Sequence, residues 1–517
     1  MIARWYTAII AIAFMVFSGA ALAAATTTGA STKSNPYVIP SATLPAGKVR
    51  TVAILSAGEH AGNGYRMVGV PDGLGAWSSD DDSFTLLMGH ELRHNRGIKR
   101  AHGAAGAFVS RWTIRKSDLA VVAGEDLVRS PAAVHTWNRE TAKYVTDADT
   151  WSRFCSADLA PVSAFFHDGD GTRDRLFLTG EEYDERYPVN VGKPDHGRAF
   201  AFVASGAHAG EAWQLPRLGR MAFENVVASP HAQKKTVVML MDDADSEVDP
   251  DKTVSPSELY LYVGTKTRQG HPIERAGLTN GELYGLRIRR GEDLLAQEDD
   301  LFGLGNKKTG FLASARFEPH RIGSAAGLSG IELQFETIAA DVMRMQRIED
   351  GAWDPRADRR NDFYFVTTAS ITRNSRLWRL RFDDVERPDA GGTIEMLLQG
   401  DEGHRMLDNI AIDRHGRILM QEDPSSSERL GKIWLYGIDR RQLIEIAAHS
   451  PEFFQRGSPS FLTQDEESSG IIDAEQVLGE GWFLFTSQAH YRFGDPEVVS
   501  GGQLLALYVA PEIGTNR

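Results

Sequence analysis

The chain has 517 residues and a formal net charge of −14, with 56 Lys and Arg against 70 Asp and Glu. No block of basic residues interrupts this acidic sequence, which argues against a nucleic-acid-binding surface. The length allows a large buried core, in two or three average domains or in one large domain built from repeats. Cys155 is the only cysteine, so no intramolecular disulfide can form.

The N-terminus has the pattern of an export signal. Arg4 precedes an apolar stretch over residues 7–20, and Ala21-Leu22-Ala23 then forms an A-x-A cleavage site. No twin arginine is present, so we expect a Sec-type signal peptide over residues 1–23 rather than a membrane anchor. No later stretch is long enough to span a membrane. These features predict a periplasmic or secreted protein, with residues 24–48 as an extended leader.

Strand patterns dominate the rest of the chain. The segments are short, rich in β-branched and aromatic residues, and bounded by Gly, Asp, Asn or Pro. They cover residues 49–55, 83–88, 107–114, 174–180, 197–204, 235–241, 257–264, 281–288, 361–368, 375–382, 416–423, 432–438 and 481–487. Only the segments near 288–300 and 331–347 suggest short helices.

Many short strands separated by turns are typical of a sandwich, a barrel or a propeller. A weak repeat of a polar turn followed by an apolar strand recurs along the chain, and acidic segments occur in nearly every part of it. These features favour an all-β propeller, in which strand ends from distant sequence meet around one channel. We therefore predict a single propeller domain over residues 49–517, with loop insertions and a few short helices.

Carboxylates stand where several of these apolar segments end. They are Glu91 in LLMGHEL, Glu181 and Glu182 in LFLTGEE, Glu224 in GRMAFENVV, Glu349 in QRIEDG, and Asp408 in MLDNIAI. Gathered at one mouth of a closed β structure, they would repel each other unless cations lay between them, and hard divalent cations prefer oxygen ligands. This pattern predicts a multi-metal site with hydrolytic chemistry. Because neighbouring strand residues face opposite sides, only one of Glu181 and Glu182 should reach a given metal.

Three other motifs leave alternatives open. His90-Glu91-Leu92-Arg93-His94 matches the zinc-peptidase pattern H-E-x-x-H, which needs a helix, whereas the preceding residues read as a strand. The segment 167–174 resembles the start of a calcium loop but lacks its terminal Glu, so a polar hairpin is the simpler interpretation. Arg347 stands two residues before Glu349, where it could hold a phosphate oxygen or form an ordinary salt bridge.

In their order along the chain, these segments resemble the PhoX-type alkaline phosphatase family. The resemblance extends from about residue 50 to the C-terminus and rests on GHEL, RFCSADLAP, LFLTGEE, GRMAFENVV, RIEDG, MLDN and SQAH. It implies a β-propeller of about six blades and an exported phosphomonoesterase with a calcium and iron cluster. Carried over by position, the metal ligands would be Asp72, Glu91, Glu181, Glu224, Glu349 and Asp408. Arg347 would contact the phosphate.

The chain departs from the family pattern in three respects, and all three favour calcium over iron. The iron-ligating cysteine of the family falls at Gly180, and Phe223 stands where the family has a histidine. The family typically uses the twin-arginine route, whereas this chain has a Sec-type signal. Without a thiolate the site would be all oxygen, which favours several Ca²⁺ ions over Fe³⁺.

The sequence therefore predicts a monomeric, exported, metal-dependent phosphoester hydrolase acting on a small phosphorylated substrate. Two alternatives stay open beside it. One is hydrolysis of another ester, such as a phosphodiester or a lactone, because the fold does not fix the reaction. The other is a non-catalytic calcium-binding propeller. The more remote alternative is a zinc metallopeptidase using His90, Glu91 and His94.

Overall fold

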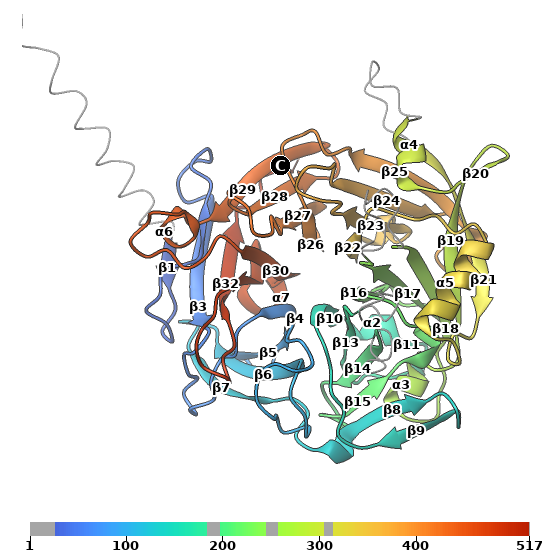
Figure 1. Cartoon of the computed structure of the whole chain (residues 1–517), viewed down its shortest axis with the longest axis horizontal. Coiled ribbons are helices and arrows are strands. Elements are labelled where there is room, and N and C mark those ends of the chain that lie inside the picture. Colours follow the sequence, from blue (N-terminus) through green and yellow to red (C-terminus); the bar gives the residue numbers. More distant parts are fainter. Residues whose placement is uncertain (1–25, 184–196, 245–256, 304–313, 516–517) are drawn as a thin grey trace, which may run out of the picture.

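The protein is an all-β propeller (Figure 1). The computed structural model describes residues 26–183, 197–244, 257–303 and 314–515, so the signal-peptide prediction lies outside the described residues. Antiparallel sheets stand around a central axis, and the strands β4, β10, β16, β22, β26 and β30 lie innermost (Figure 1). Among the described residues, no helix is long and apolar enough to cross a membrane.

The first sheets in chain order are antiparallel meanders with short additions. A four-stranded sheet contains β4 (Pro71–Ser78), β5 (Ser83–His90), β6 (Phe108–Arg115) and β7 (Val121–Asp126). A six-stranded sheet contains β10 (Phe154–Asp158), β13 (Leu176–Glu181), β14 (Ala199–Val203), β15 (Ala212–Gln214), β8 (Val134–Asn138) and β9 (Lys143–Thr146). A hairpin contains β11 (Phe166–His167) and β12 (Asp170–Gly171).

A ten-stranded sheet follows. Its first run contains β16 (Phe223–Ala228), β17 (Lys235–Asp242), β18 (Leu259–Thr265) and β19 (Glu282–Arg290), with β20 (Asp293–Leu295) beside β19. Its second run contains β22 (Ile348–Trp353), β23 (Asp362–Thr367), β24 (Arg376–Phe382) and β25 (Gly392–Leu398). Strand β21 (Ser314–Gly323) pairs with both β19 and β25. Because β21 joins the two runs into one sheet, the pairing of strands does not give the number of propeller blades. The expected number of about six blades therefore stays a prediction.

The last two sheets include strands from near the N-terminus. One contains β2 (Val38–Pro40), β29 (Gln442–His449), β28 (Lys432–Gly437), β27 (Arg417–Glu422) and β26 (Leu407–Ile412). The other contains β1 (Thr26–Thr28), β3 (Val49–Ser56), β32 (Gly501–Val509), β31 (Trp482–Ala489) and β30 (Glu466–Asp473). Pairing of β3 with β32 closes the ring with the two ends of the chain. The segment expected as a leader therefore contributes β1 and β2 to these two sheets.

Among the described residues, helices are few and short. The longest, α5 (Gly330–Ala339), begins with a capping box in which Ser329 and Glu332 each accept a hydrogen bond from the other's backbone N–H. The others are α2 (Val162–Phe165), α3 (Pro272–Arg275), α4 (Glu298–Gly303), α6 (Pro451–Phe454), α7 (Glu475–Leu478), η1 (Pro131–Ala133), η3 (Pro216–Leu218), η4 (Ala357–Arg359) and η5 (Pro388–Ala390). Helices α4 and α5 occupy parts of the two segments expected to be helical, whereas residues 288–290 continue β19.

The core lies between neighbouring sheets. Leu87 and Val109, from β5 and β6, pack against Phe177 and Phe200, from β13 and β14, in one fully buried cluster. Burial of each such side chain contributes about 1.5–3 kcal/mol before the entropy of ordering is subtracted. All thirteen strands expected from the sequence are confirmed. Most of the innermost strands were not recognised as strands.

The innermost strands approach each other closely. A Cβ built on Gly73 of β4 would lie 2.5 Å from the backbone nitrogen of Ala157 in β10. We therefore expect Gly73→Ala to lower the free energy of unfolding by about 1–3 kcal/mol, because backbone atoms must move to admit the methyl group. Urea unfolding measures this change. A Cβ at Gly327 would meet nothing within 4 Å, so the control Gly327→Ala should stay within about 0.5 kcal/mol of wild type. Equal effects of the two substitutions would contradict close packing of the inner strands.

Candidate metal centre

Each innermost strand is irregular at the same point. Where it pairs with the next strand, the register shifts, and two residues are left out of regular pairing. These two residues are Asp72-Gly73, Cys155-Ser156, Glu224-Asn225, Glu349-Asp350, Asp408-Asn409 and Gly470-Ile471. Such a bulge bends the strand and re-aims the side chains within it. The same local irregularity therefore recurs around the axis, once per inner hairpin.

The first residues of five bulges form one cluster with acids from nearby strand ends. Four overlapping groups have ligand atoms within 4.8 Å of one another. The groups are Asp72–Glu91–Cys155, Cys155–Glu182–Glu224, Glu224–Glu349–Asp408 and Asp408–Asp423–Glu467. Glu91, Glu182 and Asp423 directly follow β5, β13 and β27, whose ends pair with the starts of inner strands. Shared members connect the four groups into a continuous arc of eight carboxylates and one thiol.

The second residues of four bulges, Ser156, Asn225, Asp350 and Asn409, form a polar layer behind this arc. Asn409 donates to Ser156 Oγ at 2.8 Å and accepts from the backbone N–H of Gly470 at 3.0 Å. Asn225 donates to Asp350 Oδ1 at 2.7 Å. Later residues of the inner strands, together with Asn225 and Asp350, line a cavity of about 590 Å³. Asp158 and Asp473 also line this cavity, but neither belongs to the four groups of the arc.

Burial and mutual repulsion make these carboxylates hard to ionise without a cation. Burial, followed by the charges of neighbouring acids, raises the pKa of Asp72, Glu224 and Asp408 well above the usual range. Burial also raises the pKa of Glu182 to about 8 and that of Asp423 to about 7. In the described residues, Asp72 Oδ1 is buried without a hydrogen-bond donor. This oxygen has the environment of a metal ligand.

Two arginines supply part of the missing positive charge. Arg153 donates from Nε to Glu91 Oε1 at 2.6 Å and approaches Glu182 Oε2 at 2.5 Å. Burial alone would raise the pKa of Glu91, but Arg153 and Gln488 outweigh it and lower that pKa. Arg347 contacts Asp243 at 2.6 Å and Glu349 at 3.1 Å. These two guanidinium groups offset only part of the negative charge that the ionised cluster would carry.

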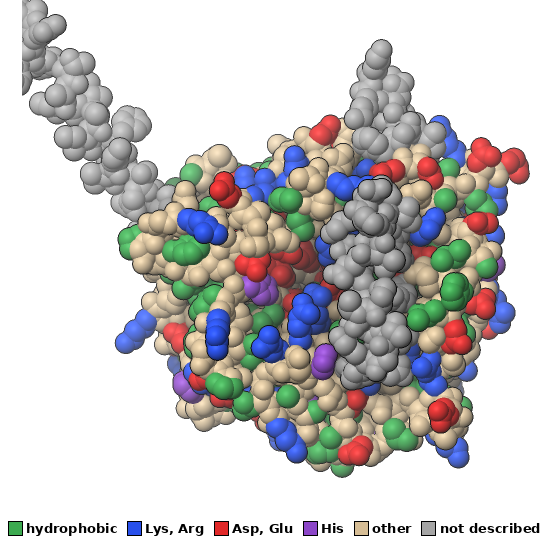
Figure 2. All heavy atoms as spheres, in the orientation of Figure 1, with side chains coloured by type: hydrophobic (Ala, Val, Ile, Leu, Met, Phe, Trp, Pro, Cys, Tyr) green, Lys and Arg blue, Asp and Glu red, His purple; other side chains and the backbone are tan. Residues whose placement is uncertain are grey.

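Arg347 is held in an unusual backbone conformation. Its φ is +60°, in the left-handed region that residues with a Cβ seldom adopt. Its side chain is 25% exposed, although its acidic partners are almost fully buried. The guanidinium is therefore fixed to the rim of the cluster while part of it remains accessible. Figure 2 shows acidic side chains in the central hollow of this face, with basic side chains beside them.

The last inner hairpin contributes an amide and an imidazole. Gln488 Nε2 donates to Asp72 Oδ2 at 2.8 Å and to Glu91 Oε2 at 3.1 Å. His490 Nε2 lies 3.5 Å from Glu467 Oε2. Burial lowers the pKa of His490, but the hydrogen bond and charge of Glu467 outweigh that effect and raise the pKa to about 9. His490 is therefore protonated at neutral pH in the metal-free protein.

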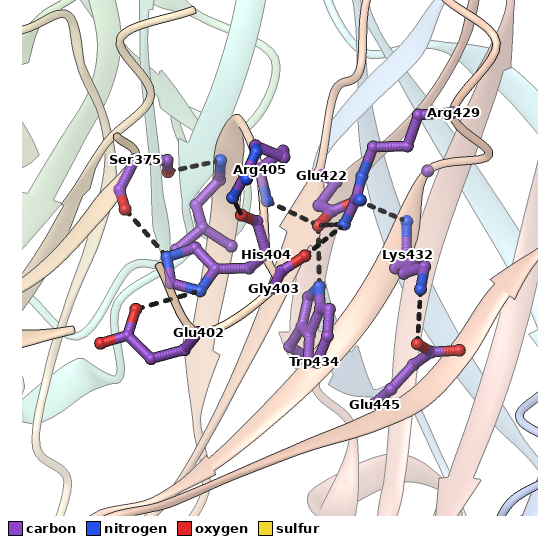
Figure 3. A network of polar contacts seen from close by, with 12 residues as sticks. Ser375, Glu402, Gly403, His404, Arg405, Glu422, Arg429, Lys432, Trp434 and Glu445 are labelled. Carbon is purple, nitrogen blue, oxygen red and sulfur yellow. Dashed lines mark hydrogen bonds and ion pairs between the residues drawn. The ribbon is translucent and has the colours of Figure 1, made fainter. Parts of the chain in front are cut away.

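A buried network behind Asp408 and Asp423 fixes the strands that carry them (Figure 3). Glu422, fully buried at the end of β27, accepts from Trp434 Nε1 and Arg429 Nε, both at 2.8 Å. His404 Nε2 lies 2.8 Å from the carbonyl of Ser375, whose Oγ accepts from the backbone N–H of Leu407. Asp408 and Asp423 directly follow Leu407 and Glu422. The network therefore sets the positions of both acids.

Most of the sequence-predicted site residues come together, and one does not. Asp72, Glu91, Glu224, Glu349 and Asp408 all lie in the cluster, with Arg347 beside it. Glu181 does not. It is fully buried on the opposite side of β13, where Arg198 Nε donates to it at 2.8 Å and the backbone N–H of Ser152 at 3.1 Å. Glu182 takes the expected place, as the alternation of strand faces requires.

The H-E-x-x-H motif does not form a helix. His90 is the last residue of β5 and is fully buried, stacked on Phe108 with its Nε2 2.9 Å from Ser110 Oγ. Burial lowers the pKa of His90 to about 3. His94 lies in the following turn, so the two histidines do not share a helix face. The zinc-peptidase arrangement is therefore not present.

The calcium-loop-like segment 167–174 also adopts its simpler alternative. It includes the β11–β12 hairpin, in which His167 pairs with Asp170. Asp170 forms ion pairs with Lys234 at 2.5 Å and Arg268 at 2.8 Å. A carboxylate held between two cations is a poor calcium ligand. This segment is a polar hairpin.

Cys155, Asp423 and Glu467 are cluster residues that were not among the predicted ligands. The sequence led us to expect an all-oxygen site, whereas Cys155 Sγ lies within 4.8 Å of oxygens from Asp72, Glu91, Glu182 and Glu224. A Cβ on Gly180 would stand 2.3 Å from Phe223 Cβ, so position 180 has no room for a thiol. The sequence does contain a pattern that could have identified Cys155. Five inner strands repeat an apolar residue, a potential ligand, and a small or polar residue, as P-D-G, F-C-S, F-E-N, I-E-D and L-D-N.

Comparisons with known proteins support the fold. Neither a protein-family model nor a curated protein sequence matches the chain. Pseudomonas fluorescens PhoX in complex with vanadate, a transition state analogue, superposes with a TM-score of 0.61 at 13% identity, over 91% of this chain and 96% of that one. Penicillium chrysogenum alpha-L-arabinanase complexed with arabinobiose gives a TM-score of 0.40 at 7% identity, over 89% and 98%. The first likeness establishes a distant relationship of fold with PhoX.

The raised pKa values predict how the metal-free protein responds to pH. A carboxyl whose pKa is higher in the folded state binds more protons there than when unfolded, so stability falls as pH rises. For Glu182 and Asp423, this loss spans the range from about pH 4, where unfolded carboxyls titrate, to about pH 8. Chelator-treated protein should therefore melt at a lower temperature at pH 8 than at pH 5. Scanning calorimetry tests this, and unchanged or higher stability at pH 8 would contradict the electrostatic description.

Proposed function

We propose that this chain is a metal-dependent phosphoester hydrolase whose centre is the arc of carboxylates and Cys155 at one end of the propeller channel. The observation that carries the proposal is the convergence of buried acids and a thiol from the bulged inner strands. The fold relationship with PhoX, whose structure holds the transition state analogue vanadate, supports it. The proposed substrate is a small phosphorylated molecule.

The donor set fits metals of two kinds. Carboxylates such as Glu224, Glu349 and Asp408 are hard oxygen ligands suited to Ca²⁺. Cys155 adds a soft donor suited to a transition metal such as iron. Burial and the nearby charge of Asp72 raise the pKa of the Cys155 thiol well above its usual value, so ionisation there requires a cation. We propose several Ca²⁺ ions together with one transition metal bound by Cys155.

When bound, these metals would supply Lewis-acid stabilisation of the charge that develops during displacement at phosphorus. The chain's own residues would bind and orient the substrate. Arg347, fixed by Asp243 and Glu349 yet partly exposed, presents donors to phosphate oxygens. His490 is 34% exposed and lies 3.5 Å from Glu467, where its imidazole would form a hydrogen bond with a substrate oxygen. The polar layer at Asn409 and Ser156 lies behind the centre.

Export belongs to the same proposal. The Sec-type pattern over residues 1–23 implies that the chain crosses the membrane unfolded and collects its metals outside. Calcium is plentiful in that compartment. We therefore propose a periplasmic or secreted enzyme.

Substitution of Arg347 tests the role in substrate binding. Arg347→Ala should lower kcat/KM for p-nitrophenyl phosphate by roughly 10²-fold or more, because a fixed charged donor to phosphate is lost. The exposed Arg290 provides the control Arg290→Ala, which should retain full activity. Assays with and without added Ca²⁺ would show whether turnover depends on the metal. Wild-type protein that binds calcium without hydrolysing mono- or diesters would favour another ester substrate or a structural role.

Substitution of Cys155 separates the two kinds of metal. Cys155→Ser keeps a similar volume but removes the thiolate, so the protein should lose its transition metal and retain calcium. Elemental analysis of wild type and variant measures both metals. Retention of the same transition metal by Cys155→Ser would contradict a thiolate ligand. Activity in p-nitrophenyl phosphate hydrolysis should fall in parallel with the lost metal.

A further inference from the structure

Three histidines and a glutamate gather at the rim of the propeller, outside the central channel. His208 and Glu211 lie in the turn between β14 and β15, His271 caps α3, and His135 lies on β8. In Figure 1, β8, β15 and α3 lie together near the outer edge of the ring. None of these four residues belongs to the carboxylate arc. Their contacts join the loop that follows β18 to the sheet that contains β15 and β8.

The potential ligand atoms converge on Glu211. His208 Nδ1 lies 2.9 Å from Glu211 Oε1, and His271 Nε2 lies 2.9 Å from Glu211 Oε2. Ligand atoms of these three residues all lie within 4.8 Å of one another. His135 Nε2 approaches Glu211 Oε2 at 3.8 Å. Two imidazoles and one carboxylate, with a third imidazole nearby, form a donor set of nitrogen and oxygen.

Neighbouring groups orient these ligands. Trp213 Nε1 donates to Glu211 Oε2 at 2.8 Å. The Trp213 ring also stacks on His135, with centroids 3.9 Å apart, and contacts His271 at 4.5 Å. His135 Nδ1 lies 3.0 Å from Thr146 Oγ1, which can accept a hydrogen bond from Nδ1–H and so leave the lone pair on Nε2, the nitrogen nearer Glu211. Partners of this kind hold metal-binding histidines in the required tautomer.

We propose that His208, Glu211 and His271 bind a borderline divalent cation, with Zn²⁺ the expected ion and His135 or water as fourth ligand. Bonds of about 2.0–2.1 Å in a tetrahedral zinc site place ligand atoms about 3.3 Å apart. The contacts of 2.9 Å would need to open by a few tenths of an ångström. Nitrogen and oxygen donors also suit Cu²⁺ and Ni²⁺. The ion would fasten the loop before α3 to the turn before β15.

Access favours binding. The side chain of His208 is 44% exposed and that of Glu211 is 25% exposed, so an ion can reach the group from solvent. Coordination through His271 Nε2 requires a proton on Nδ1 and ends its 3.4 Å contact with the backbone N–H of Ile273. The other half of the capping box, from Glu274 to the His271 N–H, remains.

The test compares the chelator-stripped, calcium-saturated full chain with His208→Ala/His271→Ala. Wild type should bind one more equivalent of Zn²⁺ than the double variant, and Zn²⁺ should raise its melting temperature further. With Cu²⁺ in place of Zn²⁺, electron paramagnetic resonance should show nitrogen ligands that the double variant lacks. Hydrolysis of p-nitrophenyl phosphate, as a readout of the central site, should be unaffected by the two substitutions.

His60→Ala is the matched control, because His60 is exposed and lies outside this group. It should bind Zn²⁺ and Cu²⁺ like wild type. If the double variant does not fold, His208→Ala alone provides the comparison, since this half-exposed side chain is not required by the core. Equal Zn²⁺ stoichiometry in wild type and variant, or the same copper spectrum in both, would overturn the proposal.

Discussion

The structure depends on one local constraint, a two-residue irregularity where each innermost strand pairs with its neighbour. Regular pairing would send successive side chains to alternate faces of a sheet. The bulge instead directs one side chain into the ligand cluster and the next into the polar layer behind it. Asp72, Cys155, Glu224, Glu349 and Asp408 hold the first position, and Gly470 leaves it empty in the last hairpin. There, Glu467 and Gln488 contribute from the same sheet.

Gathering these acids in a buried cluster is electrostatically unfavourable, and the residues around the cluster offset part of that free-energy cost. Burying many like charges is unfavourable unless opposite charges compensate. Arg153 and Arg347 offset only part of the negative charge. The rest of the negative charge must be neutralised by bound cations or by protons. In the metal-free chain, the raised pKa values of Asp72, Glu224 and Asp408 mean that protons do so. The surrounding network at Glu422 and the close packing at Gly73 supply the rigidity that holds the acids against their repulsion.

The outer parts of the fold could be predicted from the sequence, and the inner strands largely could not. Strands β5 and β17 contain continuous apolar runs, and β24 alternates arginine with apolar residues, so the sequence shows directly that they are strands. Inner strands such as β4 (PDGLGAWS) and β30 (EESSGIID) contain glycine and acids at the bulge, which hide the strand pattern. Five carboxylates of the centre were identified, because their order resembles a known family. Glu181 was chosen over Glu182 because the sequence did not reveal which face of β13 meets the axis. Cys155 was missed because its equivalence to the acids appears only when the five bulges are aligned.

The central claim is that the bulged strands build one shared cation site. The most direct measurement is the metal content per chain of protein purified after export, determined by elemental mass spectrometry. The account predicts more than one Ca²⁺ per chain together with a transition metal. Protein that is purified after export without chelator treatment and holds neither Ca²⁺ nor a transition metal would contradict it, because the carboxylate arc would then not bind the cations that it is proposed to share.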